Sequence, residues 1–132
     1  MIYLASPYSH PDPVVRRGRA ALAAKAASVL TEHTSHAMVY SPIVHGHAMN
    51  EHRALPLGWE FWRPRCRAAV ELSTEVALLF LDRWWDSVGM ATEYQWALEM
   101  KKPVRSYLLQ LSPRSRLIET VGPPRFNVEA RP

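Results

Sequence analysis

A continuous apolar segment in the second half of the chain restricts the possible folds more than any other feature. Residues 76–81 read VALLFL, inside a stretch that runs from Glu75 to Asp82. A membrane span needs about 20 apolar residues, so this segment is far too short to be one. Strands without polar alternation are typical of parallel sheets whose faces are both covered by helices. The segment therefore predicts the central strand of an α/β fold.

Strands and helices are expected to alternate around this segment. Further apolar runs predict strands over residues 2–5, 37–40 and 104–109, and the first two of these end at Ser-Pro. Periodic patterns predict one helix from Pro13 to about His33 and another over residues 88–101. A helix between them is expected to end at about Ser73, with Pro64 either in its first turn or kinking it. Residues 43–60 are expected to form a long loop. The order βαβαβαβ predicts a Rossmann/flavodoxin-like three-layer sandwich, with a parallel sheet in the order 2-1-3-4 and room for one extra strand.

Length and composition fit one domain. The chain has 132 residues, and 16 Lys and Arg against 12 Asp and Glu give a net charge of +4. This excess favours small anionic ligands but is too weak to indicate a nucleic-acid partner. The lone Cys66 excludes an intramolecular disulfide, and the amino-terminal sequence lacks a signal-peptide pattern, so a cytoplasmic location is expected.

The end of the chain differs in composition from the rest. Residues 1–112 are expected to form the α/β domain, and residues 113–132 a tail rich in Pro and Arg. A short helix near Arg116, a flexible end and an arm packed on a second subunit are the alternatives for this tail.

The topology predicts where a ligand binds. In open parallel sheets, ligands bind at the carboxyl ends of the strands, at the point where the strand order reverses. Here that point brings together the loops of residues 6–12 and 82–87. The second loop opens onto the helix that begins near Ser87, whose free N–H groups suit a phosphate, and Gly89 permits close approach of the backbone.

Glu93 and Tyr3 are the candidate catalytic residues. Glu93 follows the start of that helix by about two turns and can face the ligand as a nucleophile, or it can be an ordinary solvated helix glutamate. Tyr3 is either a core tyrosine or a hydroxyl within reach of Glu93.

The histidines and tryptophans suggest further contacts. His45, His47 and His52 lie close in sequence, but no Cys and no HExxH pattern completes a ligand set, so no metal is expected. His10 in the first loop is a better candidate for contacting an anion. Trp84 and Trp85 can shield the crevice or contact a second subunit.

Several of these segments together carry a family resemblance. They are residues 2–7 (IYLASP), 40–45 (YSPIVH), 86–93 (DSVGMATE) and 102–104 (KPV). In this order and spacing, over residues 1–108, they resemble the nucleoside 2-deoxyribosyltransferase superfamily. The resemblance is to a small branch of it that is similar to (deoxy)nucleoside 5′-monophosphate N-glycosidases.

The resemblance implies cleavage of a base–sugar bond without a cofactor. It assigns Glu93 as nucleophile, Tyr3 as its partner hydroxyl, Tyr8 near the base and Ala5 as a backbone contact. Further substrate contacts are expected from the remaining candidates, Ser6, Ser9, His10, His45, Asp86, Ser87 and Gly89. A homodimer whose neighbouring chains help to close each site is also implied, with no membrane partner.

Two positions bear on the substrate and the chemistry. Relatives that act on free nucleosides carry an acidic residue six positions before the nucleophile, whereas the monophosphate glycosidases carry serine there. In this chain the position is Ser87, which favours a nucleoside 5′-monophosphate as substrate. Asp86 beside it keeps base exchange between nucleosides as an alternative. Cys66 stands near where relatives carry an aspartate that assists the departing base, so His45 or His47 could take that role, or the protein could bind nucleotide without catalysis.

Overall fold

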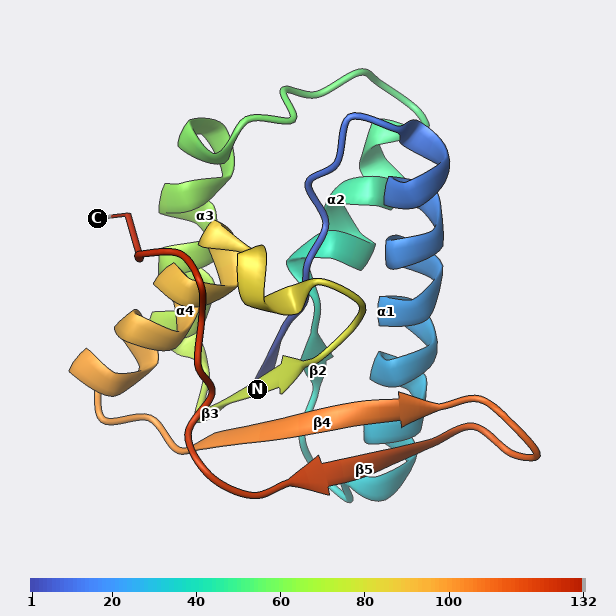
Figure 1. The fold of residues 1–132 in the computed structure, drawn as a ribbon, viewed down its shortest axis with the longest axis vertical. Helices are drawn as coiled ribbons and strands as arrows, with labels where there is room; N and C mark the ends of the chain where they lie inside the picture. The colour runs from blue at the N-terminus through green and yellow to red at the C-terminus, as the bar shows by residue number, and fades with distance from the viewer. Residues whose placement is uncertain (132) are drawn as a thin grey trace.

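A five-stranded sheet runs through the centre of the protein in a computed structural model that describes residues 1–131 (Figure 1). The strands lie in the order β2-β1-β3-β4-β5, and β5 alone runs antiparallel to its neighbour. They are β1 (Ile2–Ala5), β2 (Val39–Tyr40), β3 (Glu75–Leu79), β4 (Val104–Gln110) and β5 (Arg116–Thr120). The α/β class and the order 2-1-3-4 are confirmed, and β5 is the extra strand.

Helices cover both faces of this sheet (Figure 1). They are α1 (Pro13–His33), α2 (Pro42–Asn50), α3 (Trp59–Leu72) and α4 (Val88–Glu99), with a short 3-10 turn, η1 (Trp84–Asp86), before α4. Side-chain caps begin α1 and α2, because the Asp12 carboxylate accepts a hydrogen bond from Val14 N at 2.8 Å and Ser41 Oγ accepts one from Val44 N at 3.2 Å. Each cap is followed by a proline at the first helical position.

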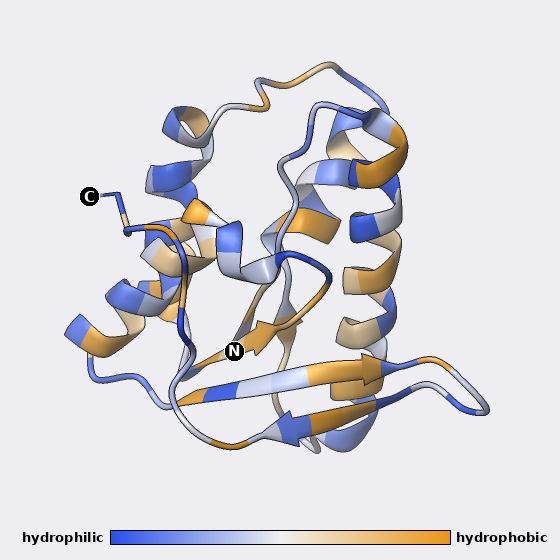
Figure 2. Cartoon of the chain, in the orientation of Figure 1, coloured by the Kyte–Doolittle hydropathy of each residue, from blue (hydrophilic) through white to orange (hydrophobic). Residues whose placement is uncertain are grey.

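The core is divided between the two faces by strand alternation. Ile2 and Leu4 of β1 pack with α1, whereas Tyr3 and Ala5 pack with α3 and α4. β3 alternates in the same way, and Figure 2 shows its apolar colouring within the sheet. Tyr3 therefore faces α4, which positions its hydroxyl for the site described below.

The structure corrects the long loop predicted over residues 43–60. Residues 42–50 form α2, and α3 already begins at Trp59, with Pro64 past its first turn. The periodicity of α2 is weak because Gly46 provides one of its buried positions. A Cβ at Gly46 would lie 3.0 Å from the ring of Trp62, so a side chain there would push the two helices apart.

The carboxyl-terminal segment also differs from one of its predicted alternatives. Residues near Arg116 form strand β5, not a short helix, and Leu117 pairs with Leu109 of β4. Tyr107, Leu109 and Leu117 cover the α1 side of the core, which explains why this segment is extended. Among residues 1–131, no helix is both long enough and apolar enough to span a membrane.

Candidate active site

A cavity of about 720 Å³ opens at the carboxyl ends of β1 and β3. The loop after β1 and the loop after β3 form two of its walls, and the start of α1, α2, α3 and the first turns of α4 contribute the others. The cavity lies at the reversal of strand order between β1 and β3, where the topology predicts a ligand site. Its volume falls within the range of small-molecule sites.

Glu93 and Tyr3 meet at the inner end of this cavity. Glu93 lies on the buried stripe of α4 with Met90 and Ala97, and only 4% of its surface is exposed. The hydroxyl of Tyr3, which is fully buried, donates a hydrogen bond to Glu93 Oε2. Glu93 also lines the cavity. The contact expected between Tyr3 and Glu93 is therefore present, and Glu93 is not a solvated helix glutamate.

Burial changes the acidity of both residues. Loss of water raises the pKa of the Glu93 carboxyl from 4.5 to about 8, although the hydrogen bond from Tyr3 opposes this rise. The pKa of Tyr3 is raised well above 10 by burial and by the neighbouring negative charge of Glu93. Tyr3 therefore keeps its proton and acts as a donor, whereas Glu93 ionises close to physiological pH.

Cys66 lies beside this pair on α3. Its thiol is buried and lines the cavity. Burial, reinforced by the negative charge of Glu93, raises the pKa of Cys66 to about 12. The group is thus a neutral thiol at physiological pH, and it is too weak an acid to protonate a leaving group efficiently.

The first turn of α4 leaves open space in front of the Glu93 carboxylate. A Cβ at Gly89 would lie 3.6 Å from Glu93 Oε1 and 3.6 Å from the ring of Trp59. The missing side chain keeps this space available to a ligand. Ser87 caps the helix, its Oγ accepting a hydrogen bond from Met90 N at 3.2 Å, and the first-turn N–H groups have no acceptor within the helix.

Ser6 adds a polar group to the inner part of the cavity. Its side chain is 4% exposed and lines the cavity, and within residues 1–131 its Oγ has no hydrogen-bond partner. A buried hydroxyl without a partner is costly, because it has lost water without gaining a replacement bond. A bound polar ligand would remove that cost.

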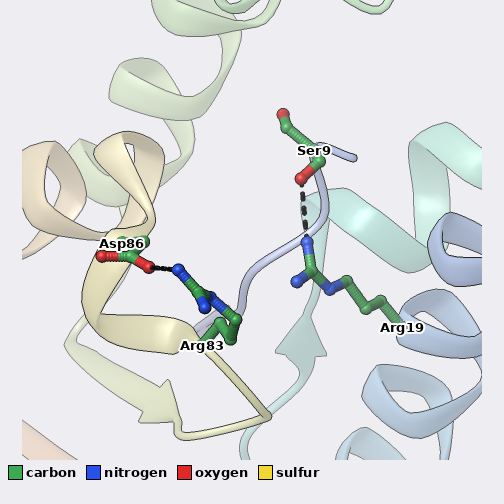
Figure 3. A network of polar contacts seen from close by, with 4 residues as sticks. All are labelled: Ser9, Arg19, Arg83 and Asp86. Carbon is green, nitrogen blue, oxygen red and sulfur yellow. Dashed lines mark hydrogen bonds and ion pairs between the residues drawn. The ribbon is translucent and has the colours of Figure 1, made fainter. Parts of the chain in front are cut away.

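Three charged side chains, Arg19, Arg83 and Asp86, lie in the outer part of the cavity lining, and Figure 3 shows their polar contacts. Arg83 pairs with Asp86, and Arg19 of α1 donates a hydrogen bond to the carbonyl of Ser9 at 2.8 Å. Arg83 has a φ of 61°, the left-handed region that a residue with a side chain rarely adopts. Such strain concentrates at binding sites, and here it directs the chain from β3 into η1.

A second set of polar contacts joins the loop after β1 to α2. The Tyr8 hydroxyl lies 2.9 Å from His47 Nδ1, and His47 Nε2 lies 3.6 Å from Glu51 Oε1. Tyr8 and His47 both line the cavity. This contact attaches the loop after β1 to α2.

The chain's own carboxyl-terminal strap, residues 123–131, also reaches the cavity. The ring centroid of Phe126 lies 5.4 Å from that of Trp84 and 5.9 Å from that of Tyr94. Asn127 N donates a hydrogen bond to the carbonyl of Trp85 at 2.8 Å. Arg131 N donates to Thr92 Oγ1 at 2.9 Å, and Arg131 lines the cavity. The strap thus crosses the start of α4.

Most candidates from the sequence lie at the cavity. The lining includes Ser6, Tyr8, Ser9, His10, Asp86, Ser87, Gly89 and Glu93. Ala5 and His45 do not line it, because Ala5 is fully buried in the sheet and His45 is exposed, with its ring against Tyr40. Trp84 is not a cavity residue either, since it stacks on Phe80.

The sequence missed other lining residues. Trp59 and Trp62 supply an aromatic wall, and their positions depend on the unpredicted start of α3. Arg19 lies one turn after Val15 on α1, and this spacing could have identified them as neighbours at the cavity. No pattern in the sequence predicts Arg131. Among residues 1–131, no group of His, Cys, Asp or Glu is arranged to hold a metal ion.

Comparison with known proteins places the chain in a family. No curated protein matches the sequence. The family described as "Domain of unknown function (DUF1937)" matches residues 1–108, which include β1, β3, α4 and the Tyr3–Glu93 pair but not the strap. Because the match covers most of the 132 residues, the chain belongs to the DUF1937 family.

Proposed function

We propose that the protein is an N-glycosidase that hydrolyses the base–sugar bond of a nucleoside 5′-monophosphate, ribo or deoxyribo. The observation that carries this proposal is the buried carboxyl of Glu93, held by Tyr3 at the inner end of the cavity. A buried, oriented carboxylate is suited to attack an electrophilic carbon, and the cavity is large enough for a small molecule. The sequence resemblance supports the same pair as catalytic residues.

The reaction follows the double-displacement route of retaining glycosidases. The Glu93 carboxylate attacks the anomeric carbon, and the base departs with the electrons of the C–N bond. Water then attacks the same carbon, releases the sugar phosphate and restores the carboxylate. Tyr3 orients Glu93 throughout, because its hydroxyl donates to Oε2 and leaves Oε1, on the Gly89 side, for attack.

A 5′-phosphate is supported by the start of α4. Ser87 lines the cavity at the helix cap, and the free N–H groups and dipole of the first turn favour an anion. Asp86 next to it would repel a phosphate, but Arg83 neutralises that carboxylate through its ion pair. The net effect of this region therefore favours a dianionic group.

Release of free base tests the proposal. The protein is incubated with ribo- and deoxyribonucleosides and with their 5′-monophosphates, and the free base is measured by chromatography. Base is expected from monophosphates only, and Glu93→Gln should abolish it. Glu99→Gln is the matched control, because Glu99 is an exposed glutamate on the same helix. Absence of base from every compound, or full activity of Glu93→Gln, would refute the proposal.

Base exchange is a second candidate, favoured by the presence of Asp86 in the cavity lining. A carboxylate there could accept a hydrogen bond from the 5′-hydroxyl of a free nucleoside. Adding a second free base to the reaction distinguishes the two activities. A transferase would form a new nucleoside, whereas the hydrolase would release free sugar phosphate at an unchanged rate.

A further inference from the structure

Departure of the base requires a proton that Glu93 cannot supply. A purine that leaves without protonation carries a negative charge, so a general acid near the base accelerates the step. Glu93 is the nucleophile and must be ionised to attack, and Tyr3 is turned toward it. Cys66 is too weak an acid, because burial raises its pKa to about 12. The proton must come from another part of the cavity.

The other acidic groups and the other histidine of the cavity lining are also unsuitable, and among them Asp82 is exposed to solvent. Asp86 is held in an ion pair by Arg83, and its side chain is 34% exposed. His10 is exposed, and its Nδ1 accepts a hydrogen bond from Asp12 N at 3.0 Å, which engages it at the start of α1. None of these groups combines an available proton with a sheltered position.

Tyr8 and His47 do combine these properties. Their contact, 2.9 Å between the Tyr8 hydroxyl and His47 Nδ1, is partly buried and lies in the cavity lining. The His47 side chain is 21% exposed, and the carboxylate of Glu51, one turn later, lies 3.6 Å from its other ring nitrogen. A carboxylate on one side of an imidazole orients the ring, so the other ring nitrogen, Nδ1, faces the Tyr8 hydroxyl.

We propose that Tyr8, His47 and Glu51 form a proton relay that protonates the departing base from the α2 side of the cavity. This inference rests on the proposed N-glycosidase function. Tyr8 is the catalytic residue that touches the base, and His47 and Glu51 act through it. The relay connects Tyr8, in the loop after β1, to solvent through Glu51, whose side chain is 66% exposed.

Protons and electrons balance in each half of the reaction. In the first half, Glu93 bonds to the anomeric carbon, the C–N bond breaks, and its electron pair goes to the base. The base takes the Tyr8 hydroxyl proton, while the protonated His47 returns one to Tyr8 from Nδ1. In the second half, water attacks the anomeric carbon and the Glu93 carboxylate leaves. The water proton passes through Tyr8 to His47 Nδ1, which restores the starting state.

Leaving groups that need no proton test this relay. The base of N7-methylguanosine 5′-monophosphate carries a positive charge and departs neutral, whereas the base of guanosine 5′-monophosphate requires protonation. The kcat/KM for each nucleotide is measured for the wild type, His47→Gln and Tyr8→Phe. We expect each variant to lose about 100-fold on the guanosine nucleotide and under about threefold on the methylated one, in line with typical general-acid contributions.

His52→Gln is the matched control, because His52 is an exposed histidine just after α2 and outside the cavity lining. Both nucleotides should react with it as with the wild type. A merely structural role for His47 would lower both rates equally, and that result would overturn the relay. Wild-type cleavage of the methylated nucleotide alone would also overturn the relay, since no general acid would be acting, yet it would leave the proposed function intact. Failure of the wild type on both nucleotides, together with no release of base from any other monophosphate of the panel, would instead count against the function itself.

Discussion

The inner and outer parts of one cavity hold their charged groups in opposite ways. At the inner end, Glu93 is 4% exposed, and its only side-chain hydrogen bond within residues 1–131 comes from Tyr3. At the outer end, Arg83 and Asp86 form an ion pair with side chains 65% and 34% exposed. The first pair is thus shielded from bulk solvent, whereas the second is partly exposed to it.

This difference determines where a substitution matters. Electrostatic interactions strengthen where water is excluded, so small changes around Glu93 alter its ionisation strongly. Exposed ion pairs contribute about 0 to 1 kcal/mol, because water and salt screen them. The inner pair should therefore control chemistry and pH response, and the outer pair should adjust binding only.

The largest effect is expected on stability when the Glu93 charge is removed. The pKa of Glu93 is about 8 in the folded protein and near 4.5 when unfolded, so the folded state holds the proton more tightly. Its contribution is fully present below pH 4.5 and is lost as the pH rises through about 8. Wild-type stability should fall across this window by a few kcal/mol, at about 1.4 kcal/mol per pKa unit, and Glu93→Gln should not show this fall.

Urea unfolding followed by tryptophan fluorescence at pH 5, 7 and 9 measures this effect. The advantage of Glu93→Gln over the wild type should increase with pH. Glu99→Gln, on the exposed side of α4, should follow the wild type at every pH. Parallel curves for wild type and Glu93→Gln would mean that burial does not control the ionisation of this carboxyl.

Removal of the Tyr3 hydroxyl should have the next largest effect. The hydrogen bond from Tyr3 lowers the pKa of Glu93, so Tyr3→Phe should raise that pKa further. For a nucleotide whose base leaves without a proton, the kcat/KM of base release should rise with pH up to about 8 in the wild type, where Glu93 ionises. In the variant this rise should move to higher pH, with about a 10-fold to 100-fold loss at pH 7, since each pKa unit changes the ionised fraction about tenfold. A loss that is equal at all pH values would indicate misplacement of Glu93 instead.

A methyl group at Gly89 should have a moderate effect. Its Cβ would contact Glu93 Oε1 and Trp59 at ordinary van der Waals distance, so Gly89→Ala should fold normally. The methyl group occupies space in front of the carboxylate, and KM should rise about threefold or more, which corresponds to roughly 0.7 kcal/mol. Gly18→Ala, with open space around its Cβ, is the control. An unchanged KM would place the substrate elsewhere in the cavity.

The smallest effect is expected at the outer pair. Asp86→Asn removes a partner of Arg83 but leaves both positions accessible to water. The unfolding free energy should change by less than about 1 kcal/mol. KM for a monophosphate should fall slightly, because a negative charge near Ser87 is removed. A change in unfolding free energy as large as the one expected for Glu93→Gln would mean that the two ends of the cavity do not differ in this way.

Much of the fold follows from local sequence patterns. The apolar run of β3 and the Asp-Pro start of α1 predict their elements within a few residues. α2 escaped prediction because Gly46 and His47 break its periodicity, and its buried face depends on Trp62 of another helix. β5 escaped because its strand state depends on pairing with β4, a tertiary effect.

The site was predictable where topology alone brings residues together. Tyr3 on β1 and Glu93 on α4 meet because the strand order places β1 beside β3, and β3 leads into α4. The tryptophan wall and the Tyr8–His47 contact required the positions of α2 and α3, which depend on side-chain packing between helices. No periodic signal encodes such contacts.

The strap reaches the cavity from a part of the chain that is separate from the strand and helix that carry Tyr3 and Glu93. Residues 123–131 lie outside the segment that matches the family, and they reach the cavity through backbone hydrogen bonds and the packing of Phe126. Phe126 contributes to the packing on η1 and α4 and would be kept, whereas the other side chains of the strap can be exchanged with little effect on the strands and helix that hold Tyr3 and Glu93. For protein engineering, the strap is a variable segment: libraries confined to its side chains other than Phe126 would vary what reaches the cavity, while the Tyr3–Glu93 pair stays constant.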